Sequence, residues 1–531
     1  MRLSRTSLTA LSVGLAAAIA PLNADAEDAV AVQYHFAGAA DLSRDANFET
    51  AARIFRAPTS ADFKTLVLNR LARVFWTSLH FDPGAKPVEV LRPMLDDLLQ
   101  VESIASFGAT QDNPSFVLAA RLDKTRAQVW QLNLQAAMRG KGAPFTAEGF
   151  SGSRWHNAFW MIPTPGWVLV GRGDGLARVR TDYLQQLQKT GRPWPALKNT
   201  WLHTIINWPL LTAGNPAPSI PLRPARATVD MTATGGRFHI TADLSYPKAV
   251  SWTPQPWHIP KDLVREPLIS FTAAQGVEPY LQLGKTFSRL ATDPFTNQFF
   301  CWAQRQMPFL SYMAWPVNDA TNVLKDLATK GLAIVNPILE RRDHSRLNWV
   351  RAASEISWNE SPLMGPFLQV APGKDGEYLL AGLFPVEETN PLAPNDLWTQ
   401  FENRSDIVYY NWERTGMRVH QWRLLCQVMS LLPPVSGRGS SVAADPKSSP
   451  PLAAVENWLG GVEFALRSTN TVTEVTRTAP DELTVTRSAP FVFTGLELVW
   501  LSHWLADVPA GPVNMNLLPR AKISGPGIPS R

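Results

Sequence analysis

Histidine and cysteine, the side chains that most often carry metal chemistry, are few in this chain and widely scattered. No two of the nine histidines lie three to five residues apart, and the only cysteines are Cys301 and Cys426. A zinc site usually includes at least one close pair of such ligands. The sequence therefore predicts no metal site and no cofactor, unless ligands from distant segments converge.

Cys301 and Cys426 admit two interpretations. In an oxidising compartment they could form a disulfide, which for so long a loop would add about 4–5 kcal/mol in the chain-entropy model. Alternatively, both are free thiols buried in apolar helices, because residues such as Phe300 and Trp302 flank them. The spacing of the two cysteines along the chain does not decide between these interpretations, because the Cα separation in the folded protein determines whether two cysteines can pair.

The most motif-like segment is Gly171-Arg172-Gly173-Asp174-Gly175, which follows an expected strand and opens an expected helix. Glycine-rich turns in this position bind phosphate through free backbone amides. The dinucleotide fingerprint needs a further glycine at position 176, where this chain has Leu176. We therefore interpret the segment as a tight turn with Asp174 near the helix N-cap.

No catalytic set of a hydrolase is evident in the sequence. Residues 149–153 have serine in place of the last glycine of a nucleophile elbow. A glycosidase needs two carboxylates facing a gap of about 5–10 Å, and spacing along the chain does not identify such a pair among 45 acidic residues. The catalytic residues are therefore left unassigned.

Tryptophan is abundant, with 20 residues, and gives the one positive indication of a ligand. Exposed aromatic faces of an exported protein can stack on sugars. Most tryptophans here alternate with Leu, Ile and Val and are expected in the core. Trp252 and Trp257 lie among prolines, so we predict that these two are exposed and bind ligand.

The elements that must position these residues occur twice along the chain. The matching segments are 116–120 and 311–315, 167–171 and 378–382, and the strand ends Asn207-Trp208 and Asn411-Trp412. Asp123 and Asn318 are predicted N-caps of the helices that follow the first pair. Long strands with helices between them indicate an α+β fold of two related units, each a mainly antiparallel sheet with helices packed on one face.

Proline-rich stretches and the repeat suggest the boundaries of these units. The expected divisions are a signal peptide at 1–26, a first α+β unit at 27–246 with an extra segment at about 77–112, a Pro-rich linker at 247–262, a second α+β unit at 263–505 with a mobile excursion at 432–451, and a flexible tail at 506–531.

The first 26 residues predict export to the periplasm or the extracellular space of a bacterium. Arg2 and Arg5 precede an apolar stretch from Leu8 to Leu22, and Ala24-Asp25-Ala26 provides a cleavage site. An uncleaved anchor is the alternative. No later window is apolar enough for an integral membrane span. The net charge is +5 with no run of Lys and Arg, so nucleic acid is not an expected partner.

A loose family resemblance agrees with these features. Phe36–Ala39, its repeat at Phe271–Ala274, and the ending Thr494–Val499 resemble a family of uncharacterised exported bacterial proteins that carry a domain of unknown function in tandem. The resemblance implies export and duplication, and it implies no activity, cofactor or catalytic residue.

These observations lead to one expected function and one alternative. We expect an exported, non-enzymatic envelope or matrix protein with a groove between two duplicated units. Its expected partner is a cell-envelope component, a polysaccharide or another exported protein. The alternative is a secreted hydrolase that acts on glycan or peptide.

Overall fold

In the computed structural model of the full chain, helices and strands alternate from Val30 to Ala506. The predicted signal, positions 432–449 of the predicted excursion and positions 507–531 of the predicted tail lie outside the described residues. The structure describes residues 30–79, 81, 86–108, 115–212, 224–250, 253–276, 297–305, 307, 310–340, 346–350, 354–358, 365–386, 389–431 and 450–506.

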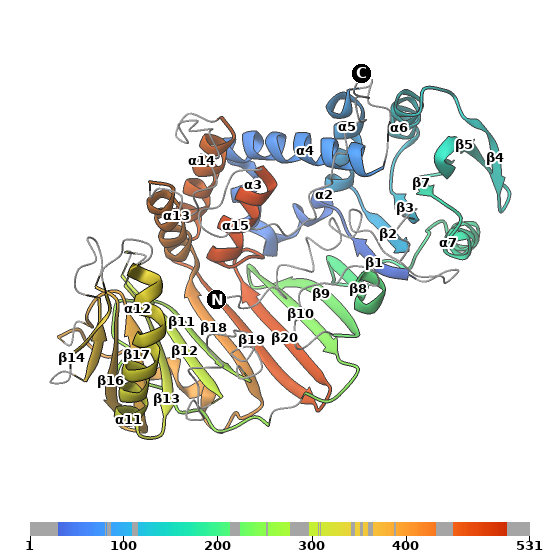
Figure 1. Cartoon of the computed structure of the whole chain (residues 1–531). Helices are drawn as coiled ribbons and strands as arrows, with labels where there is room; N and C mark the ends of the chain where they lie inside the picture. Colours follow the sequence, from blue (N-terminus) through green and yellow to red (C-terminus); the bar gives the residue numbers. More distant parts are fainter. Residues whose placement is uncertain are drawn as a thin grey trace, which may run out of the picture.

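Twenty strands within these residues form one antiparallel sheet (Figure 1). The first half of the chain supplies β1 (Val30–Phe36), β2 (Ser103–Gly108), β3 (Phe116–Ala120), β4 (Ala143–Ala147), β5 (Phe150–Arg154), β6 (Phe159–Thr164), β7 (Trp167–Arg172), β8 (Leu202–Asn207), β9 (Arg226–Thr234) and β10 (Arg237–Ser245). The second half supplies β11 (Leu268–Gln275), β12 (Gln298–Gln304), β13 (Ser311–Val317), β14 (Asn348–Val350), β15 (Glu355–Ser357), β16 (Phe367–Gly373), β17 (Gly376–Gly382), β18 (Ile407–Arg414), β19 (Asn470–Ala479) and β20 (Glu482–Ala489).

Strand pairing gives the same order in both halves. From its outer edge, the first half runs β4, β5, β6, β7, β3, β2, β1, β8, β9, β10. The second half runs β14, β15, β16, β17, β13, β12, β11, β18, β19, β20. At the centre β10 pairs with β20, so the two halves form one continuous sheet.

Helices connect the strands within each half. Those of the first half are α2 (Ala39–Leu42), η1 (Ala46–Phe48), α3 (Glu49–Arg56), α4 (Pro58–Ser78), α5 (Pro87–Gln100), α6 (Lys124–Ala137), η2 (His156–Ala158), α7 (Ala177–Thr190) and α8 (Trp208–Thr212). Those of the second half are α11 (Ala320–Asp326), the π-helical turn η3 (Leu327–Gly331), α12 (Leu332–Glu340), η5 (Asn395–Leu397), η6 (Thr399–Phe401), α13 (Thr415–Leu431), α14 (Pro450–Ala465) and α15 (Gly495–Ala506).

Two of the matched segments occupy equivalent places in the sheet. Leu118 of β3 faces Val170 of β7, and the matched residues Met313 of β13 and Ala381 of β17 also face each other. The register within each half therefore agrees with the alignment of these segments.

The Asn-Trp pairs are not equivalent, which corrects the expectation that both end a strand. Asn207 is the last residue of β8, and Trp208 opens α8. Asn411 and Trp412 instead lie inside β18, because the strand continues through Glu413, which pairs with both β11 and β19.

One expected boundary also differs from the structure. The extra length of the first half lies before Ser103 and therefore does not extend to 112, because β2 takes the same place in the strand order as β12. The expected linker at 247–262 lies between β10 and β11, and it packs against the rest of the protein, since Val250 and Ile259 are buried in two hydrophobic clusters.

The central strands of the sheet are amphipathic. Along β9, Ala227, Val229 and Met231 are buried, whereas Thr228 and Asp230 point to the opposite side and are partly exposed. This alternation is typical of an antiparallel sheet with one packed and one solvated face. We call the packed side of these strands the helix face and the other side the polar face.

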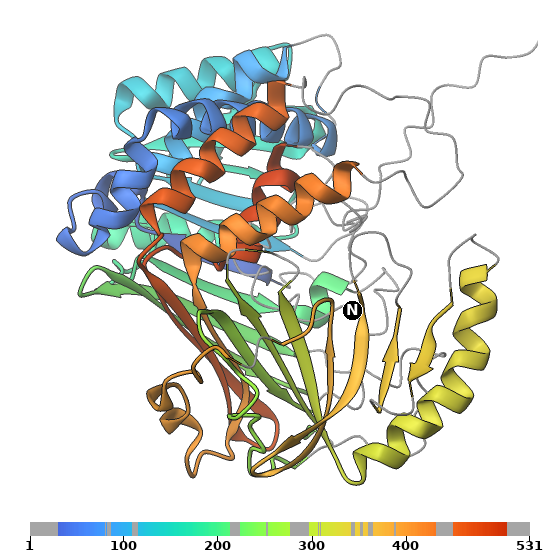
Figure 2. The ribbon, with the colours of Figure 1, turned by 90° about the vertical axis from the view of Figure 1, so that its left-hand side faces the viewer.

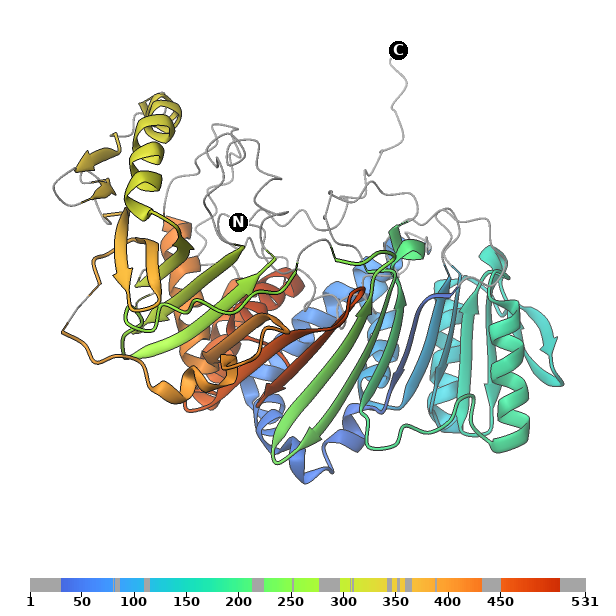
Figure 3. The same cartoon turned by 90° about the horizontal axis from the view of Figure 1, so that it is seen from below.

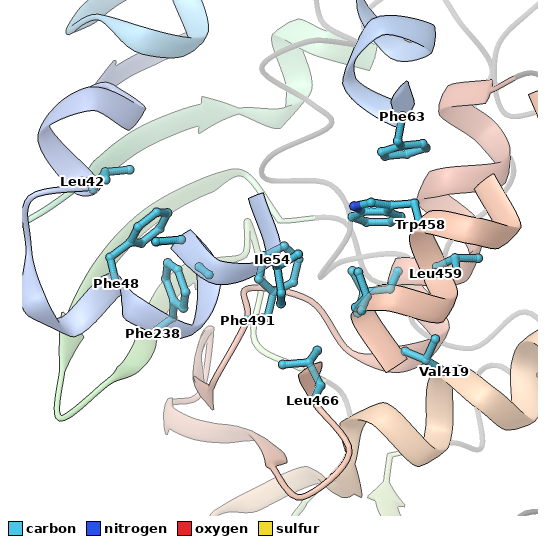
Figure 4. Packing of buried hydrophobic residues seen from close by; sticks show 14 of the residues in the cluster. Leu42, Phe48, Ile54, Phe63, Phe238, Val419, Trp458, Leu459, Leu466 and Phe491 are labelled. Carbon is cyan, nitrogen blue, oxygen red and sulfur yellow. The ribbon is translucent and has the colours of Figure 1, made fainter. Parts of the chain in front are cut away.

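A large core joins the helix face to helices from both halves of the chain. Phe63 of α4 stacks on Trp458 of α14 at 4.2 Å between ring centroids, and Ile54, Phe238 and Phe491 belong to the same cluster (Figure 4). Figure 2 shows the blue helices of the first half beside the orange and red helices of the second half, above the sheet. The α+β class and the mainly antiparallel sheet predicted from the sequence are confirmed.

Candidate functional site

A row of polar residues crosses the polar face from strand to strand. Each member is the direct cross-strand partner of the next, on strands β1, β8, β9, β10, β20 and β19 in that order. The row consists of His35, His203, Asp230, Thr241, Thr486 and Glu474. Neighbouring strands lie about 4.8 Å apart, so functional groups recur at that interval across both halves of the molecule.

The four central members of this polar row have the same order of side-chain types on both sides of the β10–β20 pairing. Asp230 and Thr241 lie in the first half, and Thr486 and Glu474 occupy the matching strands of the second half. The order is therefore carboxylate, threonine, threonine, carboxylate. The two carboxylates are separated by three strand intervals, about 14 Å, which exceeds the gap that a glycosidase pair spans.

Asp230 lies closer to another carboxylate of the same face, Asp243. Asp230 is opposite Thr241, and Asp243 follows Thr241 by two residues, so the two aspartates are diagonal neighbours with Cα atoms about 7–8 Å apart. Asp230 Oδ1 lies 2.8 Å from His203 Nδ1, and Asp243 accepts a hydrogen bond of 2.8 Å from the Thr484 hydroxyl. Glu482 of β20 is a second diagonal neighbour of Asp243, so the register of the polar face provides two such carboxylate pairs.

The β1 end of the polar row is buried and neutralised by arginine. His35 Nε2 lies 2.8 Å from Glu102 Oε1, and both side chains are less than a tenth exposed. The same carboxylate binds Arg192, whose guanidinium lies 5.7 Å from the ring centre of Trp167. Buried charges in proteins are normally paired, and Glu102 directly precedes β2 while His35 lies on β1, so we assign this end to positioning β1 against β2.

The β19 end of the row is partly exposed and carries its own counter-charge. Glu474 accepts a hydrogen bond of 2.9 Å from Arg404, which also binds Asp406 at 2.8 Å. The Arg404 guanidinium holds the pKa of Asp406 below its usual value. Between the two ends, Thr241, Asp243 and Thr486 are exposed to solvent.

Helical elements cover the polar face on both sides of this open region. Tyr183 and Leu184 of α7 pack on Ile104, which is the cross-strand neighbour of His35. Trp398 and Phe401, beside η5 and η6, pack on strands of the second half. Helices therefore lie mainly on one side of the sheet, with α7 on the other, and Figure 3 shows the open green and red central strands in front of the blue helices.

Aromatic residues lie near both margins of the open region. Trp194 is 38% exposed, and its ring meets Tyr183 of α7 edge-on at 6.0 Å. Trp412 is partly buried on β18 and is the cross-strand partner of Val472, which pairs with Ser488. An exposed aromatic ring is therefore present at the Trp194 side, whereas Trp412 packs partly against the core at the other side.

The predicted ligand-binding tryptophans do not form an exposed pair. Trp252 lies outside the described residues. Trp257 is half-buried, because its ring contacts Phe300 at 5.9 Å and Phe401 at 5.5 Å in the hydrophobic cluster beneath η6. Proline-rich surroundings thus do not place Trp257 in solvent, because the segment packs against β12.

Cys301 and Cys426 are free thiols in different parts of the protein. Cys301 lies on β12 beside Phe299 and Met313, and Cys426 lies on α13 against the large core. The expectation of a helix around Cys301 is wrong, because its neighbours alternate between the two faces of a strand. Burial raises the pKa of Cys426 to about 11, so this thiol is unreactive at neutral pH.

The glycine-rich segment at 171–175 has a packing role. Gly171 is part of β7, where a Cβ atom would lie 2.2 Å from the Trp160 ring. Asp174 does not cap α7, which begins at Ala177 without a side-chain cap, and instead pairs with Arg154 at 2.8 Å. The interpretation as a tight turn agrees with the positive φ of Gly173.

One of the two predicted N-caps is confirmed and the other is wrong. Asp123 caps α6 by accepting a hydrogen bond of 2.8 Å from the Arg126 amide, which confirms that prediction. In the second half the cap is Asp319, not Asn318, because Asp319 accepts from the Asn322 amide at 3.2 Å.

A buried charge cluster that the sequence analysis did not identify lies on the helix face beneath α13 and α15. Arg487 of β20 donates two hydrogen bonds to Glu497, at 2.7 and 3.0 Å, and a third to Thr473. Glu497 also accepts from the Thr494 amide, while its own amide donates to the Thr494 hydroxyl. The Thr-x-x-Glu spacing of this capping box was the available sequence signal.

Glu413 is the other carboxylate of this cluster, and it has no hydrogen-bonded cation among the described residues. It is 3% exposed and accepts a hydrogen bond of 2.7 Å from the Gly495 amide. Burial raises the pKa of Glu413 to about 7, although the Gly495 amide and the Arg418 guanidinium oppose the shift. The cluster anchors α15 to β18 and β20, and it faces away from the polar row.

No group of three or more histidine, cysteine, aspartate and glutamate side chains within the described ranges is arranged to hold a metal ion. A pocket of about 490 Å³ lies beside the β4–β5 hairpin, lined by Arg154, Trp155 and His156 among others, with no carboxylate side chain. It lies near the sheet edge, apart from the polar row. No helix in the described part of the chain could cross a bilayer.

The sequence contains a partial signal for the polar row. Threonine, aspartate and serine recur at every second position of the short segments 228–234, 241–245 and 484–488, which predicts strands with a solvated face. The pairing of β10 with β20 joins residues 237 to 251 positions apart, from Ser245 with Glu482 to Phe238 with Ala489. Nothing in local spacing indicates that these two polar faces form one surface.

Comparison with known proteins gives little further information. No family model and no curated protein matches the sequence. Among solved structures, crystal forms IV and III of TP0453 are similar at a TM-score of 0.22 and 14% identity, covering 41% of this chain and 77% of that chain. Crystal form I of TP0453 matches at 0.22 and 13% identity, covering 47% of this chain and 82% of that chain.

Proposed function

We propose that this is an exported, non-enzymatic protein of the bacterial envelope or matrix that binds a polysaccharide on its polar face. In this proposal the binding site spans the junction of two copies of one α+β unit. Export rests on the signal-like first 26 residues. The duplication is supported by the shared strand order of the two halves.

The observation that carries the proposal is the open polar row between two covered ends of the sheet. Small-molecule sites are usually enclosed and mostly apolar, whereas this surface is open, and carboxylate, hydroxyl and imidazole groups recur at each strand. A polymer with hydroxyl groups on successive units can use such a repeat. Trp194, at one margin, provides an exposed aromatic face for stacking.

The proposal replaces the expected groove between separate units. The halves meet through β10 and β20 in one sheet, so the ligand would lie on the sheet itself and contact residues of both halves. A polysaccharide is favoured over a cell-envelope protein as the partner, because the core of a protein interface is depleted of charged residues, whereas carboxylates recur along the polar row.

The test is co-sedimentation of the full chain with insoluble polysaccharides, including peptidoglycan. Thr486→Lys places a bulky side chain at the centre of the row, and Thr146→Lys makes the same change at an exposed position of the edge strand β4. We expect T486K to weaken binding at least tenfold and T146K to leave it unchanged. Equal effects of the two substitutions, or no binding to any polysaccharide, would contradict the proposal.

A secreted hydrolase remains the second candidate because of the diagonal pair Asp230 and Asp243. Their Cα atoms lie about 7–8 Å apart, and the carboxyl groups of an inverting glycosidase are about 6.5–9.5 Å apart. The distinguishing measurement is release of reducing ends from the polysaccharide that binds. Turnover by the unmodified chain that is lost in both D230N and D243N would favour the hydrolase, and binding without turnover favours the first proposal.

A further inference from the structure

Two phenylalanines on the helix side of the molecule are unusually exposed. Phe464 near the end of α14 is 80% exposed, and Phe55 near the end of α3 is 57% exposed. Phe55 is held in place by Phe48, at 6.0 Å between ring centroids, and by Phe491, at 5.6 Å. Large apolar side chains that remain in water together often mark an interaction site.

The helices that carry these two residues are neighbours. Gly461 of α14 lies so close to Thr59 that a Cβ atom at Gly461 would be 3.2 Å from the Thr59 hydroxyl. Thr59 follows Phe55 by four residues, and Phe464 lies about one turn beyond Gly461. Both phenylalanines therefore lie at one corner, which we call the aromatic corner.

Three arginines surround the aromatic corner. Arg53 and Arg56 flank Phe55 on α3, and Arg467 follows Phe464. All three are exposed, and none forms an ion pair with another residue of the described ranges. Two exposed carboxylates also lie near the corner, Glu49 one turn before Arg53 and Asp62 three residues after Thr59, so the excess of positive charge is small.

The carboxylates of α14 point away from the corner. Glu456 and Glu463 both bind Arg423 of α13, at 3.0 and 2.7 Å. Glu456 and Glu463 are two turns apart, so they share the side of α14 that faces α13. Phe464 lies on the outer side of the helix together with Asn457, which is exposed and carries no charge.

We propose that the aromatic corner docks the protein onto an anionic phospholipid surface. Phenylalanine side chains enter the boundary between headgroups and acyl chains, and basic residues beside them are attracted to anionic lipids. The unpaired positive charge selects an anionic surface over a zwitterionic one. The two exposed rings distinguish this site from a purely electrostatic site for another polyanion. The inference does not depend on the polar face, which lies on the other side of the sheet.

The test is co-sedimentation of the full chain with phosphatidylcholine vesicles and with mixed vesicles that also contain phosphatidylglycerol. We expect binding to the mixed vesicles that weakens with salt. Phe464→Ser and Phe55→Ser should each weaken it about tenfold, because each removes an apolar group worth at least about 1.4 kcal/mol on burial. Replacing Arg53, Arg56 or Arg467 by Gln should cost about fivefold per residue.

Leu132→Ser is the matched control, because Leu132 is 64% exposed on α6, away from the aromatic corner. We expect L132S to bind like the unmodified chain, and F464S to unfold at an unchanged temperature. Absence of vesicle binding, equal loss in L132S, or binding that depends on the arginines and not on Phe464 and Phe55 would overturn the proposal. Self-association that F464S abolishes, without vesicle binding, would overturn it as well.

Discussion

At the residue scale, the strongest constraint is the buried charge cluster under α15. Arg487 and Glu497 are each less than a tenth exposed and form a bidentate pair. Glu413 is buried beside them with only a backbone amide as hydrogen-bond donor among the described residues. The cluster therefore contains Glu497, whose charge is paired with Arg487, and Glu413, which is costly to ionise. These two carboxylates should respond differently to substitution.

Glu413→Gln tests the carboxylate that is costly to ionise. Because the pKa of Glu413 is raised to about 7 in the folded chain, from about 4.3 when unfolded, the folded state binds the proton more tightly. Stability from this group is present below about pH 4.3 and is lost as the pH rises through 7. We expect E413Q to match the parent at pH 4 and to exceed it by up to about 3 kcal/mol at pH 8, measured by urea unfolding.

Glu497→Gln tests the satisfied carboxylate. Removing the charge leaves the buried Arg487 guanidinium uncompensated, so we expect a loss of about 3–5 kcal/mol. Asp326→Asn is the control, because Asp326 pairs with Lys330 at an exposed site on the surface and should change stability by less than about 1 kcal/mol. Similar losses in the two variants would contradict the structural role of the cluster.

At the element scale, local patterns predicted some elements of the first half well. The strand expected before the glycine-rich segment is β7, and Asp123 caps α6 as expected. Local patterns suffice there, because strand alternation and helix caps depend on neighbouring residues. The positions of Trp257 and Asn411 were misjudged because contacts distant in sequence bury them.

Gly171→Ala tests the packing role of the glycine-rich segment. A Cβ atom there would meet both the Trp160 ring and the Phe116 carbonyl, at 2.2 and 2.6 Å. We expect a loss of about 1–3 kcal/mol, the usual cost of overpacking, in thermal or urea unfolding. Gly140→Ala has no neighbouring atom within 4 Å and should be neutral. Unchanged stability of G171A combined with lost phosphate binding would instead revive a phosphate-binding role.

At the scale of the whole molecule, pairing of β10 with β20 changes what the two halves can do. Each half alone has only the solvated strand face that is usual in an antiparallel sheet. Joined edge to edge, they give an uninterrupted polar surface with the same order of groups on both sides of the centre. Helices α3, α4, α13, α14 and α15 support it from behind through one shared core. A sequence indicates the two halves but not the edge at which they join.

The central claim is that a polysaccharide lies across this junction, and hydrogen exchange of the full chain with and without the bound polymer tests it most directly. Binding across the junction predicts slowed amide exchange in both Arg226–Ser245 and Asn470–Ala489, the strands on the two sides of the β10–β20 pairing. Protection confined to one half, to the edge strands β4 and β14, or to the aromatic corner would contradict it.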